Sequence, residues 1–193
     1  MTTRVTVCAD DGTPLAAWTF GSTTASVIVV FVHGHCLRTE AWWFLRDELL
    51  RQWGSDTRMV FYDHRGHGDS AGADPATYTI DQLGHDLDAV LRAVAPTGPV
   101  VLISHSMGAM VVLAYARLFP ATIGTRVVGV GLIAGAAAGI TAVGLVAALV
   151  GRALGTSAGT SGSRPAIPAV LPVLTSLGEV ESPSVTAVLP AAG

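Results

Sequence analysis

The fold is decided by nine residues, Val100-Val101-Leu102-Ile103-Ser104-His105-Ser106-Met107-Gly108. The four apolar residues at the start have the length and composition of a buried parallel strand. The small residues that follow predict a tight turn, and residues 109–118 predict a helix that begins without a spacer. A strand, a tight turn and a helix in direct succession lift the serine at the turn, Ser106, above the sheet.

The composition favours one globular domain. The 193 residues carry a net charge of −3 and contain no lysine, which gives no support for binding to nucleic acid or to an acidic membrane surface. Two cysteines, Cys8 and Cys36, are too few for a disulfide framework and suggest a reducing compartment. Asp10 and Asp11 precede any apolar run that could act as a secretion signal, so we expect a cytoplasmic protein.

The charge is concentrated in the first 126 residues, which hold 21 of the 25 charged side chains. We therefore expect three parts: a core over 1–133, an apolar cap-like helix over 134–151, and a tail over 152–193. The tail is rich in Pro, Gly, Ser and Ala and has no aromatic residue, which predicts disorder. Its collapse onto an open edge of the sheet is the alternative.

Strands and helices alternate along the core. This pattern predicts an α/β fold with a mostly parallel sheet and helices on both faces. A β-hairpin turning at Asp11-Gly12 comes first. Strands are then expected over 27–32, 59–62, 100–103 and 127–133, and helices over 40–53, 80–94 and 109–118.

Two of these helices carry start signals. Thr39 is expected to be the N-cap of the first helix, and Trp43 is expected on its buried face. Thr79 and Gln82 have the spacing of a capping box at the start of the second helix.

Three short motifs follow three of the strands. They are His33-Gly34, Asp63-x-Arg65-Gly66-x-Gly68-x-Ser70, and Ser104-x-Ser106-x-Gly108. In this order and spacing they resemble the α/β-hydrolase superfamily of serine esterases, lipases and haloperoxidase-like hydrolases. The last motif is similar to its G-x-S-x-G nucleophile elbow, with Ser104 in place of the first glycine. The resemblance covers roughly residues 1–133 and implies an α/β-hydrolase-like sheet that is truncated after the sixth strand.

The resemblance implies roles for three residues. Ser106 would be the nucleophile that attacks a carboxylic ester, and the backbone N–H groups of His35 and Met107 would form the oxyanion hole. The alternatives are structural: a small residue that caps a helix, and a turn without catalytic duty at His33-Gly34. No cofactor or metal ion is implied, and the expected partner is a small-molecule ester.

The loop from Asp63 to Ser70 holds two carboxylates, two histidines and one arginine, but its spacing specifies no metal site. The resemblance implies a scaffold in which Arg65 and Asp63 bond the backbone around the glycines. We expect the Cys36 side chain to be packed rather than reactive. We expect His85 to lie on a solvated helix face with Asp81, Asp86 and Asp88.

The family's catalytic acid and histidine follow the nucleophile in the chain. Here no Asp follows Asp88 and no His follows His105, so Ser106 lacks the family's general base. The second reading is therefore a catalytically inactive remnant, truncated or frameshifted, or a binding protein that keeps the fold. The oligomeric state is left open.

A membrane association is a further alternative. Residues 127–151 carry no charge, lie between Arg126 and Arg152, and are numerous enough to span a bilayer. The glycines in this window and the strand-like pattern of its first seven residues favour a strand followed by a cap-like helix instead.

Overall fold

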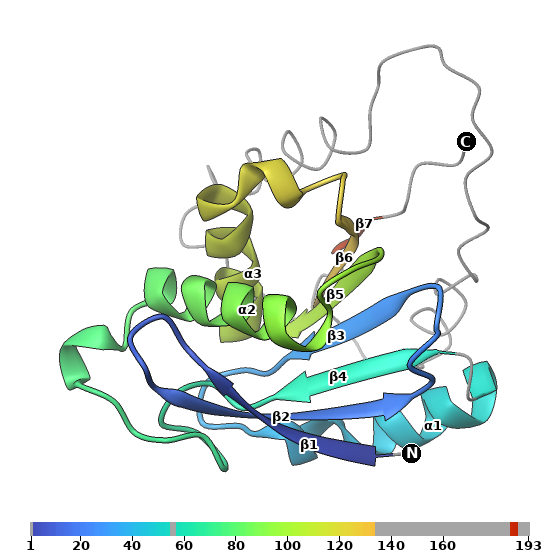
Figure 1. Cartoon of the computed structure of the whole chain (residues 1–193), viewed down its shortest axis with the longest axis horizontal. Coiled ribbons are helices and arrows are strands. Elements are labelled where there is room, and N and C mark those ends of the chain that lie inside the picture. The colour runs from blue at the N-terminus through green and yellow to red at the C-terminus, as the bar shows by residue number, and fades with distance from the viewer. Residues whose placement is uncertain (1, 55–56, 134–185, 189–193) are drawn as a thin grey trace.

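A seven-stranded sheet is the framework of the computed structural model, which describes residues 2–54, 57–133 and 186–188. The strands lie in the order β1-β2-β4-β3-β5-β6-β7 (Figure 1). Their bounds are β1 Thr2–Cys8, β2 Pro14–Gly21, β3 Ile28–Val32, β4 Arg58–Tyr62, β5 Val100–His105, β6 Val127–Ile133 and β7 Thr186–Val188. The four central strands β4, β3, β5 and β6 run parallel, while β1, β2 and β7 add antiparallel pairs at the edges. The mixed, mostly parallel sheet confirms the predicted fold class.

Helices cover both faces of the sheet, as predicted (Figure 1). They are α1 Trp43–Trp53, α2 Ile80–Val94 and α3 Met107–Leu118, with short 3-10 turns η1 Thr39–Trp42, η3 Pro75–Thr77 and η4 Pro120–Thr122. Successive side chains of a strand point to opposite faces. In β3, Val29 and Phe31 therefore pack in one cluster with Leu49 of α1, while Val30 and Val32 join the α2 and α3 cluster.

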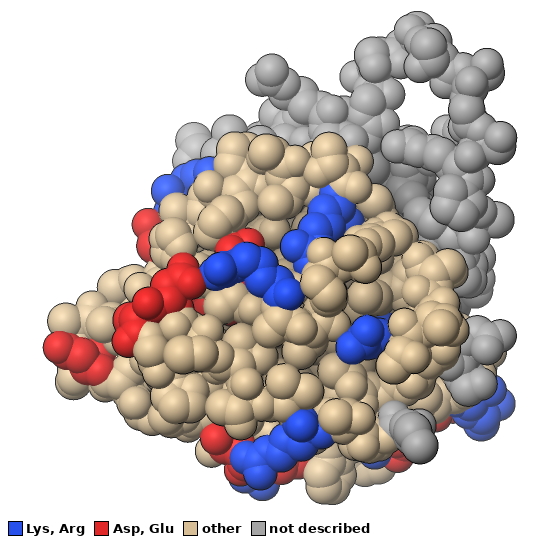
Figure 2. Space-filling view, viewed as in Figure 1, with Lys and Arg blue, Asp and Glu red and all other residues tan. Residues whose placement is uncertain are grey.

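Charged side chains lie mostly on the outside of these layers. Figure 2 shows acidic and basic side chains next to one another on the face in view. Arg92, for example, pairs with Asp10 at 2.7 Å and with Asp88 at 2.8 Å. Exposed pairs of this kind contribute about 0–1 kcal/mol each, so the stability of the fold comes from the interior.

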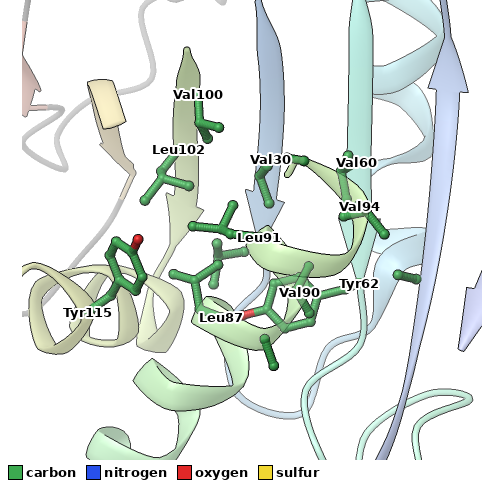
Figure 3. Close-up of a cluster of buried hydrophobic side chains, with 14 of the residues drawn as sticks. Val30, Val60, Tyr62, Leu87, Val90, Leu91, Val94, Val100, Leu102 and Tyr115 are labelled. Atoms are coloured by element: carbon green, nitrogen blue, oxygen red, sulfur yellow. The ribbon is translucent and has the colours of Figure 1, made fainter. Parts of the chain in front are cut away.

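The larger apolar cluster lies between α2, α3 and the sheet. Figure 3 shows side chains of α2 directed at side chains of the central strands. Both sets are buried to at least 97% of their surface: Leu87, Val90, Leu91 and Val94 from the helix, and Val30, Val60, Val100 and Leu102 from the strands. Full burial of such a side chain contributes about 1.5–3 kcal/mol, which makes this layer the main source of stability.

Two local predictions are confirmed, the second of them in part. β1 and β2 form the expected antiparallel hairpin, with Gly12 at a φ of 85° in its turn. The Thr79 half of the predicted capping box forms, because its Oγ1 accepts a hydrogen bond from the Gln82 N–H at 3.1 Å, whereas the Thr79 N–H donates to the Thr77 carbonyl and not to the Gln82 side chain. Both signals depend only on neighbouring residues, which is why the sequence carries them clearly.

The start of α1 differs from the prediction. Residues 39–42 form η1, in which a turn takes three residues instead of 3.6, so the buried face of the helix is shifted. Trp42 is buried, whereas Trp43 is 52% exposed, so the prediction for Trp43 was wrong. Thr39 is not an N-cap either, because its N–H donates to Asp63 Oδ1 at 2.8 Å and its side chain caps no helix.

The C-terminal part of the chain contributes β7. Its three residues pair antiparallel with β6, with Gly131 opposite Ala187. They belong to the tail for which we predicted disorder. The rest of that tail and the predicted helix over 134–151 lie outside the described residues. Of the uncharged run 127–151, residues 127–133 form β6, and no helix in the described part of the chain is long and apolar enough to cross a membrane.

Candidate functional site

Three loops meet at one edge of the sheet. They follow β3, β4 and β5, which are neighbours and run parallel, so their carboxyl ends lie together. Ligands of open α/β sheets bind at this edge. The three sequence motifs, which begin at His33, Asp63 and Ser104, therefore come together at one place.

Ser106 occupies the sharp turn between β5 and α3. Its backbone has φ 52° and ψ −118°. A positive φ of this size is rare for residues other than glycine. Such a conformation costs about 1–3 kcal/mol and persists only when its surroundings enforce it. Here the Ser106 N–H donates to the Ile133 carbonyl at 2.9 Å, and the Ser106 carbonyl accepts from the Ala109 N–H at 2.9 Å. The side chain is half-buried at the N-terminus of α3.

Ser104 fits the position at which the family pattern has glycine. Its side chain is fully buried in β5, and its hydroxyl donates to the Gly131 carbonyl of β6 at 3.1 Å. A buried hydroxyl with a partner carries little desolvation cost. The substitution is therefore accommodated through a bond to the neighbouring strand.

Gly108 lets α3 pack directly on β3. A Cβ atom at this position would lie 2.3 Å from the Val32 carbonyl oxygen and 2.7 Å from the His33 carbonyl oxygen. Both contacts are with backbone, which cannot move aside as a flexible side chain would. The close approach of helix and strand therefore requires glycine here.

We expect Gly108→Ala to lower the free energy of unfolding by about 1–3 kcal/mol, because the added methyl group overpacks the elbow. Urea denaturation followed by circular dichroism measures the change. Gly72→Ala is the matched control, since its Cβ would meet only the Tyr78 hydroxyl oxygen, at 3.9 Å. Equal stability of the two variants would contradict the close packing of α3 on β3.

The loop after β3 lies against the elbow. A Cβ atom on Gly34, the residue before His35, would lie 3.0 Å from Ser106 Cβ. Within the described part of the chain, neither the His35 N–H nor the Met107 N–H donates a hydrogen bond. Met107 is the first residue of α3, where the helix dipole adds partial positive charge. Ser106 thus lies at the N-terminus of α3, and the loop that carries His35 lies against it.

Two buried histidines support this loop. The His33 Nε2 accepts from the His64 N–H at 3.1 Å, so its Nδ1 carries the proton and donates to the Gly34 carbonyl at 2.8 Å. The His64 Nε2–H in turn donates to the His33 carbonyl at 3.0 Å. Burial lowers the pKa of His33 to about 4 and holds the pKa of His64 well below its ordinary value. Both rings are therefore neutral at pH 7, and their hydrogen bonds hold the loops after β3 and β4 together.

No imidazole serves Ser106 as a base among the residues that the structure describes. Both nitrogens of His33 are occupied, and His35 is exposed with its ring beside His67. The His105 ring packs near Trp42, with their centroids 6.5 Å apart. None of these rings forms a hydrogen bond with the Ser106 hydroxyl in the described part of the chain.

The Asp63–Ser70 loop is a scaffold, as predicted, but its two charged residues act differently. The Asp63 carboxylate accepts from the Thr39 N–H and the Asp69 N–H, each at 2.8 Å, and so joins the loops after β3 and β4. Burial raises the pKa of this carboxyl group. Among the described residues, no group of three His, Cys, Asp or Glu side chains is placed to hold a metal ion.

Arg65 corrects the prediction that it bonds the backbone around the glycines. Its guanidinium group is fully buried and donates two hydrogen bonds to Asp86 of α2, at 2.7 and 2.6 Å. It also donates to Asp11 in the hairpin turn and to Thr77. Asp86 is 0% exposed, so its predicted place on a solvated face with His85 was wrong. These bonds raise the pKa of Arg65 and keep it charged inside the protein.

Cys36 is also placed differently from the prediction. Its side chain is exposed rather than packed, and its backbone has a φ of 58°. The Cys36 N–H donates to His67 Nε2 at 3.4 Å. His67 was not singled out from the sequence, and its contact with the loop after β3 joins residues 31 positions apart, which local patterns do not reveal.

A cavity of about 580 Å³ lies away from Ser106. It is bounded by α1 and by side chains of β1 and β2, including Trp18, Phe20, Trp43 and Arg46. Neither Ser106, His35 nor Met107 lines it. Arg46 extends over the rings of Phe20 and Trp43, at 4.9 and 5.6 Å from their centroids, so the aromatic wall already holds a cation of the protein itself.

Comparison with known proteins gives the same picture of the fold. The model of the alpha/beta hydrolase family matches residues 29–190. An esterase from Thermogutta terrifontis is similar over 80% of this chain, with 27% identity and a TM-score of 0.57. The epoxide hydrolase VrEH1 from Vigna radiata is similar over 67%, with 25% identity and a TM-score of 0.55. The haloalkane dehalogenase DatA from Agrobacterium tumefaciens C58 is 22% identical over 69% of this chain, with a TM-score of 0.56, which shows the fold alone.

The chain spans only part of these structures. It covers 53% of the esterase, 38% of the epoxide hydrolase and 41% of the dehalogenase. No curated protein sequence matches it.

Proposed function

The chain belongs to the alpha/beta hydrolase family, and from this premise we propose that it is a serine hydrolase that acts on carboxylic esters. Ser106 is the proposed nucleophile, and the N–H groups of His35 and Met107 are the proposed oxyanion hole. The observation that supports this most strongly is the backbone of Ser106, whose φ of 52° stores strain on a turn that sits at a helix N-terminus. A residue with only a capping role does not need that conformation, since ordinary N-caps lie in the β region.

The chemistry follows from the groups at the turn. The Ser106 Oγ gives up its proton and forms a bond to the acyl carbon of the ester, and the carbonyl oxygen becomes negative. The C–O bond to the alcohol then breaks, and the alcohol leaves with the proton that Ser106 lost. Two N–H donors near that oxygen stabilise the charge as it develops. Water then cleaves the acyl-serine bond and releases the acid. A hydroxyl nucleophile suits this acyl transfer, and it is the reason why we favour an ester among the substrates of the family.

The second candidate is a catalytically inactive member of the family that keeps the fold as a binding protein. It is supported by the lack of an imidazole at Ser106 among the described residues, and of any histidine after His105 in the sequence. In an intact triad that imidazole removes the serine proton and returns it to the leaving group.

Labelling with a fluorophosphonate probe distinguishes the two candidates. We expect mass spectrometry of the labelled protein to find the phosphonyl group on Ser106, and Ser106→Ala to abolish the labelling. Ser22→Ala is the control and is expected to label as the wild type does, because Ser22 is a half-buried residue in the turn after β2 whose hydroxyl pairs with Thr24. A wild-type chain that labels no faster than Ser106→Ala would favour the inactive protein.

The proposed setting is the cytoplasm, and the proposed partner is a small ester. The two cysteines are both exposed and unpaired in the described structure, which is compatible with a reducing compartment. The net charge of −3 without lysine supports the proposal that nucleic acid is not a partner.

A further inference from the structure

His67 lies between the loops that follow β3 and β4. Its half-buried ring packs against three other histidines, with centroids 5.5 Å from His33, 5.7 Å from His35 and 6.0 Å from His64. The two buried histidines, His33 and His64, are fixed by their own hydrogen bonds, so they form a rigid wall behind it. His67 is therefore held in place from one side.

The hydrogen bonds of His67 define which of its nitrogens carries the proton. Nδ1 lies 3.0 Å from the Arg65 carbonyl oxygen, which can only accept, so Nδ1 carries the hydrogen. Nε2 is then a bare acceptor, and it receives the Cys36 N–H at 3.4 Å. The Arg65 carbonyl is itself well anchored, because the Arg65 side chain is clamped to Asp86.

The Cys36 backbone needs such a partner. Its φ of 58° is a left-handed conformation that costs a non-glycine residue about 1–3 kcal/mol unless its surroundings hold it. The peptide that bonds to His67 is the one that joins His35 to Cys36. The orientation of this peptide group constrains the preceding peptide group, between Gly34 and His35, which carries the His35 N–H.

We propose that His67 is a positioning residue, which holds the peptide after His35 through the Cys36 N–H and thereby aims the His35 N–H at the oxyanion. This rests on the proposed function, because it adds a support to the same oxyanion hole. Protonation of His67 adds a hydrogen to Nε2, which then faces the Cys36 N–H as a second donor and releases the loop. The titratable groups that face His67 are the rings of His33, His35 and His64, with Asp63 behind them at 3.9 Å from His33 Nε2.

The test uses the two cysteines of the chain. Labelling with ¹⁵N-cysteine gives two amide signals, from Cys36 and from Cys8, which lies in β1 and serves as the internal reference. We expect the Cys36 signal to shift along the same pH curve as the His67 ring, while Cys8 stays constant. In His67→Phe the Cys36 signal should lose this response, and in His67→Gln, whose side-chain oxygen can accept a hydrogen bond, its position should return toward that of the wild type at high pH.

The rate of fluorophosphonate labelling at Ser106 is the functional readout. We expect a decrease of roughly tenfold in His67→Phe, smaller than the 10²–10³-fold cost of losing an oxyanion donor outright, with recovery in His67→Gln. His85→Gln is the control, since His85 lies on α2 against Phe119.

Two outcomes overturn the proposal. One is a Cys36 amide signal that changes neither with pH nor on replacement of His67, and the other is an unchanged labelling rate in His67→Phe. If His67→Phe does not fold, the wild-type titration and His67→Gln decide. An amide response without any labelling of the wild type would instead refute the proposed function and leave the His67–Cys36 contact established.

Discussion

Replacing Arg65 with methionine is expected to destabilise the protein by about 3–5 kcal/mol, enough to unfold a large fraction of a marginally stable domain. The guanidinium group is fully buried and Asp86 is 0% exposed, so the change leaves a carboxylate without its counter-charge inside the protein. The variant also loses the bonds that join the loop after β4 to the hairpin turn at Asp11 and to Thr77. Urea denaturation at pH 7 gives the free energy of unfolding.

Two further variants test the reason for this loss. Arg65→Met combined with Asp86→Leu removes both charges, and we expect it to be more stable than Arg65→Met alone. Arg92→Met is the surface control, with an expected change of about 0–1 kcal/mol, because Arg92 and its partner Asp10 are both more than half exposed, although the second partner, Asp88, is largely buried. A double variant that is less stable than Arg65→Met would contradict the view that an unpaired buried charge is the main cost.

The second large effect concerns turnover. We expect the chain as it stands to hydrolyse a short-chain nitrophenyl ester orders of magnitude more slowly than the usual enzyme range of about 1–1000 per second. The physical reason is the lack of a histidine after His105, because an elbow without its general base retains only oxyanion stabilisation and binding. Steady-state hydrolysis by the purified protein measures this rate.

Added imidazole should replace the missing base in part. We expect the rate to rise with imidazole concentration in the wild type, and to show only the uncatalysed imidazole reaction in Ser106→Ala. Ser22→Ala is expected to respond as the wild type does. Turnover within the usual range without imidazole, lost in Ser106→Ala, would show that a base is already present and would refute this prediction.

The sequence predicts the central part of the fold because its signals are local or periodic. The strands β3 and β5 are short, continuous apolar runs, and such a run predicts a strand that is buried on both faces of a parallel sheet. The three motifs follow strands that prove to be neighbours, but the sheet order β4-β3-β5 is not the order along the chain, so only the structure shows that they meet at one edge. The prediction that Thr79 caps α2 needed only a spacing of three residues.

The errors arise where a long-range partner or a change of helix type decides the outcome. Asp86 lies three residues after Leu83 and one before Leu87, which places it on the buried stripe of α2. That position was a usable signal, but its partner Arg65 lies on another element. Trp42 is buried in place of Trp43, because the 3-10 turn η1 precedes α1 and shifts the buried face. The contact of His67 with Cys36 has no counterpart in any local pattern.

The position of β3 in the sheet has a consequence for synthesis on the ribosome. Its two neighbours are β4 and β5, and Ile28 pairs with Arg58 on one side and with Val100 on the other. The second edge of β3 therefore stays open until residues as far as β5 have been made, which takes several seconds at roughly 5–20 residues per second. All five residues of β3 are apolar and buried in the finished protein. During that interval the nascent chain carries an apolar strand whose second edge has no partner. We therefore expect a chaperone or a wrong partner to bind first at β3.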